Sequence, residues 1–196
     1  HPDAWGVQIV FDNQVILGTR ARKTRTKSFN AFSSIDYPET AMFRDRRLIQ
    51  FLQRPAEYTH AVFSTALDPN VFVLRLGPGM RADIIPMLEG RYRALVLESF
   101  GVGGLPGGDD GAMFAAVRDW CGAGHLAVFT TQVPHEGSDL AVYEVGRAAK
   151  ALPGVLEAHD MTPEATAVKL MWVLGQTTDR AEAEKLFLTP VQWDIL

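Results

Sequence analysis

With 196 residues, the chain is long enough to bury the core of one domain, or of one domain plus part of a second. Its apolar content of 47% and charged content of 21% are those of an ordinary globular protein, and no apolar run approaches the roughly 20 residues that a membrane span needs. The net charge of −4 divides into +3 over residues 1–60 and −7 over residues 61–196, which gives no reason to expect nucleic acid or an anionic membrane as a partner.

The first predicted element is a β-hairpin. Residues 7–12 and 14–17 have strand character, and Asp12-Asn13 between them is a turn signal. A basic stretch follows Gly18: Arg20, Arg22, Lys23, Arg25 and Lys27. Taken alone, this stretch is either a solvated loop or a contact for phosphate or nucleic acid, and the lack of interleaved aromatic residues disfavours the second alternative.

Residues 28–68 have no sustained hydrophobic period, so the sequence favours an extended connection with short helical pieces and a domain boundary there. From Val71 the pattern changes to short, nearly continuous apolar runs, which suit parallel strands covered on both faces. Three such runs occupy residues 71–76, 93–98 and 126–131. Helix-length segments are expected at 81–89, 110–122, 139–151, 162–174 and 179–187. This alternation predicts a small doubly wound α/β domain.

Two of the expected helices have clear start signals. Thr162 before Pro163 has the pattern of an N-cap with proline at the first helical position, and residues 179–182 have the spacing of a capping box. Between residues 165 and 174 only Thr166 and Lys169 are polar, so that helix should be largely buried. The single Cys121 excludes an internal disulfide and falls on an apolar helical face, which favours a core residue over a nucleophile.

Two loops follow predicted parallel strands, where open α/β sheets bind ligands. The glycine-rich segment at residues 100–108 matches neither a dinucleotide fingerprint nor a Walker loop, and a tight turn is an equal alternative. Residues 131–139 concentrate polar groups, but Ser138 has no nucleophile elbow around it, and a polar loop capping a helix from Asp139 is favoured over a Ser-His-Asp triad. The histidines occur as His135-Glu136 and His159-Asp160, without zinc-site spacing, so neither a metal nor another cofactor is expected.

Three strings resemble one known family. They are VQIVFDNQVILGTRARK (residues 7–23), ALVLESFGVGGLP (94–106) and LAVFTTQVPHEGSDLAVYEVGRAAKALPGVLEAHDMTPEATAVKLMWVLGQT (126–177). The chain resembles the C-terminal portion of cytoplasmic (type I) bacterial L-asparaginases. The resemblance implies the asparaginase fold: a remnant of the N-terminal catalytic domain at 1–37, an interdomain connection at 38–68, and a C-terminal α/β domain at 69–196.

The same resemblance implies roles for individual residues. Residues 18–23 fit the family pattern G-x-R-x-x-K, whose lysine completes a Thr-Asp-Lys group, and this makes Lys23 the expected catalytic residue. An ammonium there would orient a carboxylate and adjust the pKa of the group that takes the proton from threonine or water. The expected shaping residues of a substrate site, in this or a neighbouring subunit, are Gly103, Gly104, Gln132, Ser138 and Asp139.

The activity implied is hydrolysis of L-asparagine, with L-glutamine as a second possible substrate, to the acid and ammonia through a threonine acyl-enzyme. The nucleophile is expected in an N-terminal half that the chain does not contain, so the chain alone is expected to be inactive. A cytoplasmic homodimer or homotetramer is expected, without nucleic acid or membrane partners. Two alternatives stay open: a non-catalytic α/β binding or assembly module, and an amidotransferase subunit acting on charged tRNA.

Overall fold

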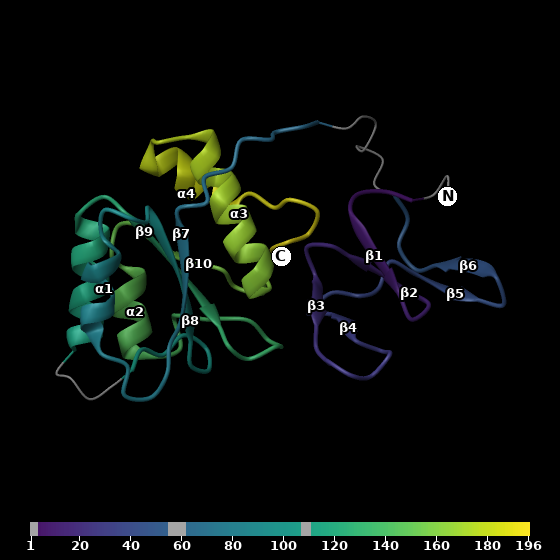
Figure 1. The fold of residues 1–196 in the computed structure, drawn as a ribbon, viewed down its shortest axis with the longest axis horizontal. Coiled ribbons are helices and arrows are strands. Elements are labelled where there is room, and N and C mark those ends of the chain that lie inside the picture. The colour runs from purple at the N-terminus through teal and green to yellow at the C-terminus, as the bar shows by residue number, and fades with distance from the viewer. Residues whose placement is uncertain (1–3, 55–61, 107–110) are drawn as a thin grey trace.

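Two β-structures of different kinds make up the chain, and the computed structural model describes them over residues 4–54, 62–106 and 111–196. Figure 1 shows an antiparallel unit, built from strands β1 to β6, beside a helix-covered parallel sheet built from strands β7 to β10. The two β-structures follow one another in the chain, in the order that the sequence predicts.

The antiparallel unit contains a four-stranded sheet made from two hairpins. Strand β1 (Gln8–Phe11) pairs with β2 (Gln14–Leu17), β5 (Ala41–Arg44) pairs with β6 (Arg47–Gln50), and the order is β1-β2-β5-β6. Each hairpin turns on two residues with positive φ, as a type I′ turn requires. These are Asp12 and Asn13 (49° and 63°), and Asp45 and Arg46 (48° and 62°). The predicted hairpin and its turn are therefore present.

Residues 28–68 differ from the expectation of short helical pieces. The described part of this segment contains strands and no helix, and the pairing of β5 with β2 places residues 41–50 in the same sheet as the first hairpin. Most residues of β5 and β6 are exposed or half-buried, so one apolar face does not alternate with one polar face. The period of two that reveals a half-buried strand is therefore missing from the sequence.

Between the hairpins, the chain forms a two-stranded ribbon. It consists of β3 (Ala21–Lys23) and β4 (Phe32–Ser34), with Ala21 opposite Ser34 and Lys23 opposite Phe32. The ribbon is a sheet of its own, separate from the four-stranded sheet. Two residues of the predicted basic stretch, Arg22 and Lys23, thus lie in β3 rather than in an irregular loop.

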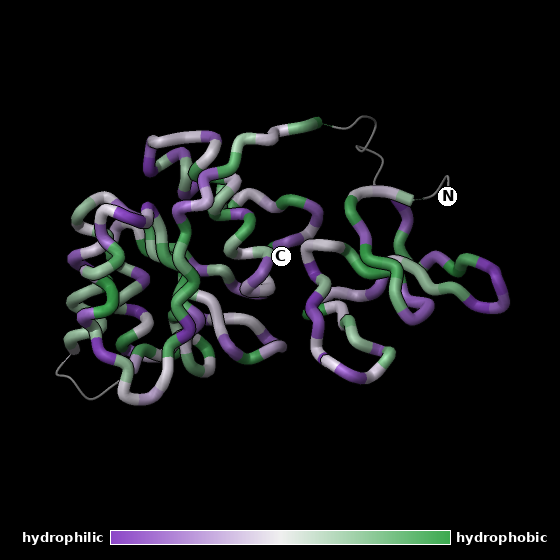
Figure 2. The backbone as a smooth tube through the Cα atoms, viewed as in Figure 1, coloured by the Kyte–Doolittle hydropathy of each residue, from purple (hydrophilic) through white to green (hydrophobic). Residues whose placement is uncertain are grey.

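The parallel sheet has the order β10-β9-β8-β7, which is the order of the chain reversed. Its strands are β7 (Val71–Arg75), β8 (Ala94–Ser99), β9 (Leu126–Thr131) and β10 (Val155–Glu157). The three predicted runs are β7, β8 and β9, and every residue of β9 is buried. Figure 2 shows the strands of this sheet as a hydrophobic interior. Strand β10 has only three residues and was not expected.

Helices cover both faces of this sheet, as the continuous apolar strands predict. Helices α1 (Ala112–Gly122) and α2 (Glu144–Lys150) pack on one face, in a core that includes Leu95, Leu97 and Phe129. Helices α3 (Pro163–Gln176) and α4 (Arg180–Leu188) pack on the other, in a core that includes Val96 and Val128. The predicted α/β class is therefore confirmed.

Several predicted helices are present, but their type or their first residue differs from the prediction. The segment at 81–89 forms two 3-10 turns, η1 (Ala82–Ile84) and η2 (Pro86–Leu88), because Pro86 cannot continue a helix from η1. Helix α2 begins at Glu144 rather than at 139. Helix α1 begins at Ala112, and Asp110, where it was expected to begin, lies outside the described residues.

The predicted helix starts are confirmed. Thr162 caps α3 by accepting a hydrogen bond from Ala165 N, and Asp179 caps α4 by accepting one from Glu182 N. Within the described ranges, no helix is both long and apolar enough to cross a membrane.

Candidate functional site at the carboxyl edge of the parallel sheet

The loops that follow β8, β9 and β10 meet at one edge of the parallel sheet. Ligands of open α/β sheets bind outside the carboxyl ends of the strands, often where the strand order reverses. The order of the described parallel strands contains no such reversal. Here the edge faces the antiparallel unit instead, and Figure 1 shows the loops projecting toward ribbon β3–β4.

The loop after β8 is a tight turn on Phe100. The amides of Gly103 and Gly104 donate to Phe100 O over 3.0 and 2.8 Å, and Phe100 N donates to Gly104 O over 3.2 Å. Gly103 has φ 141°, and a Cβ atom there would lie 2.5 Å from Leu140 Cδ2. A Cβ on Gly104 would meet Phe100 only at ordinary contact distance. Packing against Leu140 therefore requires glycine at position 103, whereas position 104 has room for a side chain. Gly107 and Gly108 lie outside the described residues.

The loop after β9 supplies polar side chains that fasten the sheet edge together. Gln132 Nε2 donates to Leu76 O over 2.6 Å and to Glu98 O over 2.9 Å, which ties the ends of β7 and β8. Asp139 N donates to Val102 O over 2.7 Å, joining this loop to the glycine turn. Both amide protons of Gln132 have partners within the edge, so its side chain shapes the edge.

The structure does not assemble the Ser-His-Asp alternative. The Ser138 hydroxyl lies 3.5 Å from His159 O, while His135 Nδ1 lies 3.2 Å from Asp36 Oδ1. Asp139 also does not cap a helix: its carboxylate accepts from Ala141 N in a local turn, and the N-cap of α2 is Tyr143, without a side-chain bond. The favoured prediction of a helix cap at Asp139 is therefore wrong, because four residues, 140–143, separate it from the start of α2 at Glu144.

A buried carboxylate that the sequence analysis missed supports the same loop. Glu157, at the end of β10, accepts from Leu140 N over 2.6 Å and from Lys150 Nζ over 2.8 Å. This hydrogen bond raises the pKa of Lys150 above its ordinary value, against the opposing effect of its partial burial. Glu157 thus holds Leu140 against Gly103, and the two loops form one packed edge.

Lys23 lies at the end of β3 and its side chain is exposed. Its Nζ is 6.0 Å from the centre of the Phe32 ring, the residue opposite it in the ribbon. The sequence-predicted lysine is therefore on a defined strand and free to meet another group.

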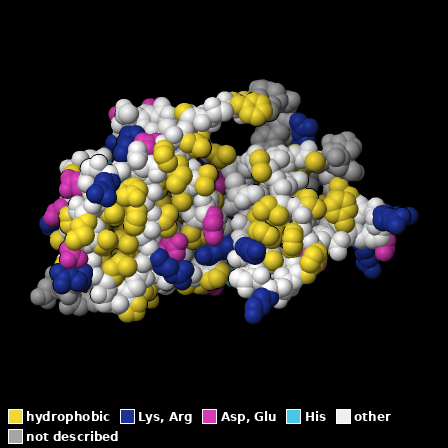
Figure 3. All heavy atoms as spheres, viewed as in Figure 1, with side chains coloured by type: hydrophobic (Ala, Val, Ile, Leu, Met, Phe, Trp, Pro, Cys, Tyr) yellow, Lys and Arg dark blue, Asp and Glu magenta, His cyan; other side chains and the backbone are white. Residues whose placement is uncertain are grey.

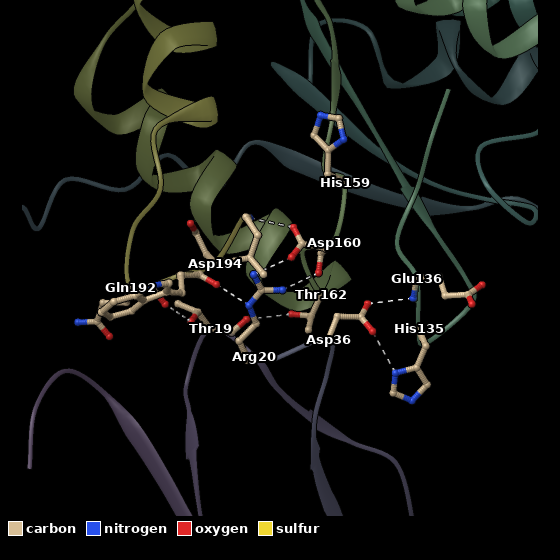
Figure 4. A network of polar contacts seen from close by, with 12 residues as sticks. Thr19, Arg20, Asp36, His135, Glu136, His159, Asp160, Thr162, Gln192 and Asp194 are labelled. Carbon is tan, nitrogen blue, oxygen red and sulfur yellow. Dashed lines mark hydrogen bonds and ion pairs between the residues drawn. The ribbon is translucent and has the colours of Figure 1, made fainter. Parts of the chain in front are cut away.

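Arg20, three residues before Lys23, is fully buried where the antiparallel unit meets the parallel sheet. Its NH2 atom lies 2.8 Å from Asp160 Oδ2, NH1 donates to Asp160 O over 2.9 Å, and Nε donates to Trp193 O. The guanidinium also lies over the Tyr37 ring, 5.4 Å from its centre. Figure 4 shows Arg20 at the centre of this network, reached from the segment after β10 and from the C-terminal tail.

Asp36, just after β4, makes a second connection. One of its carboxylate oxygens lies 3.2 Å from His135 Nδ1, and the other accepts from Glu136 N over 3.0 Å. The loop at 131–139 thus contacts the antiparallel unit of its own chain, as Figure 4 shows.

The C-terminal tail, residues 189–196, makes a third connection. A buried ion pair holds it to α3, with Lys169 Nζ 2.8 Å from Asp194 Oδ2. The tail then presents Gln192 and Trp193 to the antiparallel unit: Thr19 Oγ1 donates to Gln192 O over 2.8 Å, and the Trp193 ring packs edge-on against Trp5.

Metal ligation depends on ligand side chains that the fold groups together, and thiol chemistry depends on the pKa of the thiol. The described residues contain no group of three or more His, Cys, Asp or Glu side chains that could hold a metal ion. Burial raises the pKa of the Cys121 thiol to about 11, so the thiol is protonated at neutral pH, in line with a core residue.

Fold and site define a class of α/β protein. In this class, the carboxyl edge of the parallel sheet faces a second, antiparallel unit that carries an exposed lysine. Residues 70–187 match the family described as the glutaminase/asparaginase C-terminal domain, and residues 1–57 match the one described as asparaginase, N-terminal. The chain belongs to the glutaminase/asparaginase family.

Individual relatives agree with this membership. An L-asparaginase of Thermococcus kodakarensis is 38% identical over 182 residues, which are 92% of this chain and 54% of the relative. A subunit of the glutamyl-tRNA(Gln) amidotransferase of Metallosphaera sedula is 33% identical over 88% of this chain and 39% of the relative. The solved thermostable L-asparaginase of T. kodakarensis superposes with a TM-score of 0.90 at 35% identity, over 97% of this chain and 57% of that one. The chain thus spans about half the length of the asparaginase relative it matches.

Proposed function

We propose that this chain is the lysine-bearing second half of an L-asparaginase that hydrolyses L-asparagine to L-aspartate and ammonia. The observation that carries the proposal is the place of Lys23: an exposed ammonium on a ribbon that is joined to the carboxyl edge of the parallel sheet. The identity of 38% with a protein named L-asparaginase supports the choice of reaction.

The proposed mechanism is covalent and is shared with a catalytic half outside this chain. A threonine of that half attacks the side-chain amide, ammonia leaves, and water releases aspartate. The ammonium of Lys23 orients the carboxylate of that half and holds its pKa low, so that the proton of the nucleophile can be taken.

The loops at the sheet edge close the substrate site in this proposal. Gly103 and Gly104 give the edge its backbone shape, and Gln132 fastens it through Leu76 O and Glu98 O. Ser138 and Asp139 belong to the loop that Asp36 and Val102 O hold in place. The site formed is that of this chain or of a neighbouring copy.

The surface of the antiparallel unit supports the presence of a further half. Figure 3 shows hydrophobic side chains gathered over this unit. Its exposed large apolar residues are Val7, Val10, Phe29, Phe43, Ile49 and Phe51. Contiguous exposed apolar surface marks a place where another structure packs. We accordingly propose the domain division at 1–37, 38–68 and 69–196, with the first part, together with the strands at 41–50 that share its sheet, completing a larger catalytic domain.

Replacing the lysine in the complete enzyme, this chain together with its catalytic half, tests the proposal. Lys23→Ala should lower turnover of L-asparagine by about 10²- to 10⁴-fold, the usual contribution of proton-transfer machinery, without changing the unfolding midpoint. Lys27→Ala, at an exposed lysine of the same basic stretch, is the matched control and should leave turnover unchanged. Near-wild-type ammonia release by Lys23→Ala would overturn the assignment.

A second candidate is an amidotransferase subunit acting on charged tRNA, which the 33% identity with the M. sedula protein favours. The exposed members of the basic stretch, Lys23, Arg25 and Lys27, would then contact phosphates. This candidate predicts tRNA binding that weakens steeply with salt, because phosphate contacts release counterions. A folded chain that binds no tRNA and yields no ammonia with any catalytic half would instead be a non-catalytic assembly module.

We further propose a cytoplasmic homodimer or homotetramer of the bacterial type I group. Exposed apolar side chains beside the sheet-edge loops, Val133, Val142, Tyr143 and Val145, offer a surface for a second copy. Light scattering of the complete enzyme tests this: a mass of two or four protomers is expected, and a monomer would contradict it.

A further inference from the structure

Ribbon β3–β4 carries Lys23, and no strand pairing with the four-stranded sheet fixes its direction. A ring contact between Phe32 and Phe11 of β1 supports its far end. The ribbon forms a separate two-stranded sheet with three residues in each strand. An isolated two-stranded hairpin is at best marginally stable in water, so the ribbon needs anchors from elsewhere. Those anchors decide where the lysine points.

The root of β3 has a buried anchor. Arg20 directly precedes Ala21, and its guanidinium binds the carboxylate and the carbonyl of Asp160 over 2.8 and 2.9 Å. Its Nε donates to Trp193 O, so the segment after β10 and the C-terminal tail both hold this one side chain. A planar guanidinium with several fixed donors defines an orientation that a lysine ammonium would not.

The root of β4 has a second anchor. Asp36 follows Ser34 by two residues, and its carboxylate takes hydrogen bonds from His135 Nδ1 and Glu136 N in the loop after β9. The two roots are themselves joined, because Ile35 N donates to Arg20 O over 2.9 Å. The ribbon is therefore fixed at two points to the loops after β9 and β10.

Ala21 and Ser34 pair at the anchored end of the ribbon, and Lys23 pairs with Phe32 at its other end. A tilt of the root is transmitted along the ribbon to the ammonium. A misplacement of about 1 Å in a catalytic group can cost about 10²-fold in rate.

We propose that Arg20 and Asp36 are positioning residues: they fix ribbon β3–β4 against the carboxyl edge of the parallel sheet and so set the place of Lys23. This inference rests on the proposed function, in which Lys23 serves the carboxylate of the catalytic half. The C-terminal domain then affects the reaction by fixing the ribbon that carries Lys23 in the same chain. It also contributes the loops that close a substrate site.

The variant Asp36→Gly tests the proposal in the complete enzyme. Asp36 has φ 49°, which glycine adopts without strain, so the change removes the carboxylate and keeps the turn. Asp45→Gly is the matched control, since Asp45 has φ 48° and is exposed in the β5–β6 turn. Arg20→Lys, which keeps the charge at the buried anchor, is the second variant.

Arg20→Lys should lower kcat by about tenfold or more at little changed KM, because the lysine is displaced while the loop at 131–139 keeps its bonds to Asp36. Asp36→Gly should lower kcat by a similar factor and also raise KM, because it releases that loop as well. Moving the Lys23 ammonium away from the carboxylate should also raise the pKa of that carboxylate. The acid limb of the kcat/KM profile should then shift to higher pH by about one unit, which loss of stability alone would not cause. In the chain itself, Asp36→Gly should speed amide exchange in residues 21–24 and 31–34 but not in 94–99.

The outcomes separate this inference from the proposed function. If Lys23→Ala abolishes turnover while Asp36→Gly and Arg20→Lys match Asp45→Gly in kcat, pH profile and amide exchange, the positioning role is wrong and the asparaginase function stands. If Lys23→Ala turns over normally, the proposed function falls, and the positioning role falls with it.

Discussion

Gly103 and Leu140 are packed so closely that a side chain at position 103 would not fit. An alanine at 103 would need an unfavourable φ of 141° and would place Cβ 2.5 Å from Leu140. Gly103→Ala should therefore cost about 1–3 kcal/mol of stability, as overpacking does, measured by urea unfolding. Gly104→Ala is the control, expected within about 0.5 kcal/mol of wild type, and equal stability of the two variants would contradict this packing.

The carboxylate of Asp68 makes the free energy of unfolding depend on pH in the acid range. Burial opposes its ionisation, but the Asn70 amide and the Arg93 guanidinium together hold the pKa of its carboxyl below the ordinary value. A depressed folded-state pKa gives stability that is present above the unfolded pKa of about 3.9 and is lost as pH falls through the folded value.

The variant Asp68→Asn should therefore lose less stability than wild type between about pH 5 and pH 2. Asp119→Asn is the control, because Asp119 pairs with Arg118 while 70% exposed, and surface pairs contribute little. Identical acid profiles for wild type and Asp68→Asn would show that the carboxylate gains nothing on folding.

Single residues also show what the sequence can and cannot predict of the site. The pattern at 18–23 pointed to Lys23, and strand ends pointed to residues 100–104 and 131–139. Asp36 and Trp193 carry no such signal, because their partners are far away in the chain, 99 residues for Asp36 and His135 and 173 for Arg20 and Trp193. Contacts of that range follow from the packing of whole units.

A buried ion pair, Lys169 with Asp194, is one of the contacts that attach the C-terminal tail. Lys169 and Asp194 are 5% and 4% exposed, and burial lowers the pKa of Lys169 despite its partner. Asp194→Asn should cost about 3 kcal/mol, because the buried ammonium loses its counter-charge and keeps only its hydrogen bond to Thr189 O. The double variant Lys169→Met with Asp194→Asn should regain part of that loss in the same unfolding experiment; an unchanged single variant would mean that the pair is not needed.

At the scale of elements, prediction succeeded where the signal was local. Continuous apolar runs located β7, β8 and β9, and the caps at Thr162 and Asp179 located the starts of α3 and α4. It failed at β5 and β6, whose residues lack alternation, and at η1 and η2, where Pro86 interrupts a helical pattern. Strand β10 was too short to register, and α2 starts only after the polar turn at Asp139.

At the scale of the whole molecule, the two units differ in self-sufficiency. Both core clusters of the parallel sheet lie within residues 71–195, whereas the antiparallel unit exposes many of its large apolar side chains. Residues 66–196 alone should therefore unfold in one cooperative transition, and residues 4–54 alone should not fold. Circular dichroism during denaturation measures both; a cooperative transition for residues 4–54 would contradict the account of an incomplete unit.

We propose that the nucleophile lies in a catalytic half outside this chain, whereas Lys23 lies in this chain. Ammonia release from L-asparagine is the measurement that tests this proposal. The chain should be assayed as a single 21.6 kDa species and again after it is joined to a catalytic half. We expect no release from the chain alone, and release from the joined protein that depends on Lys23. Turnover by the chain alone would contradict the account, because the nucleophile would then lie within these 196 residues.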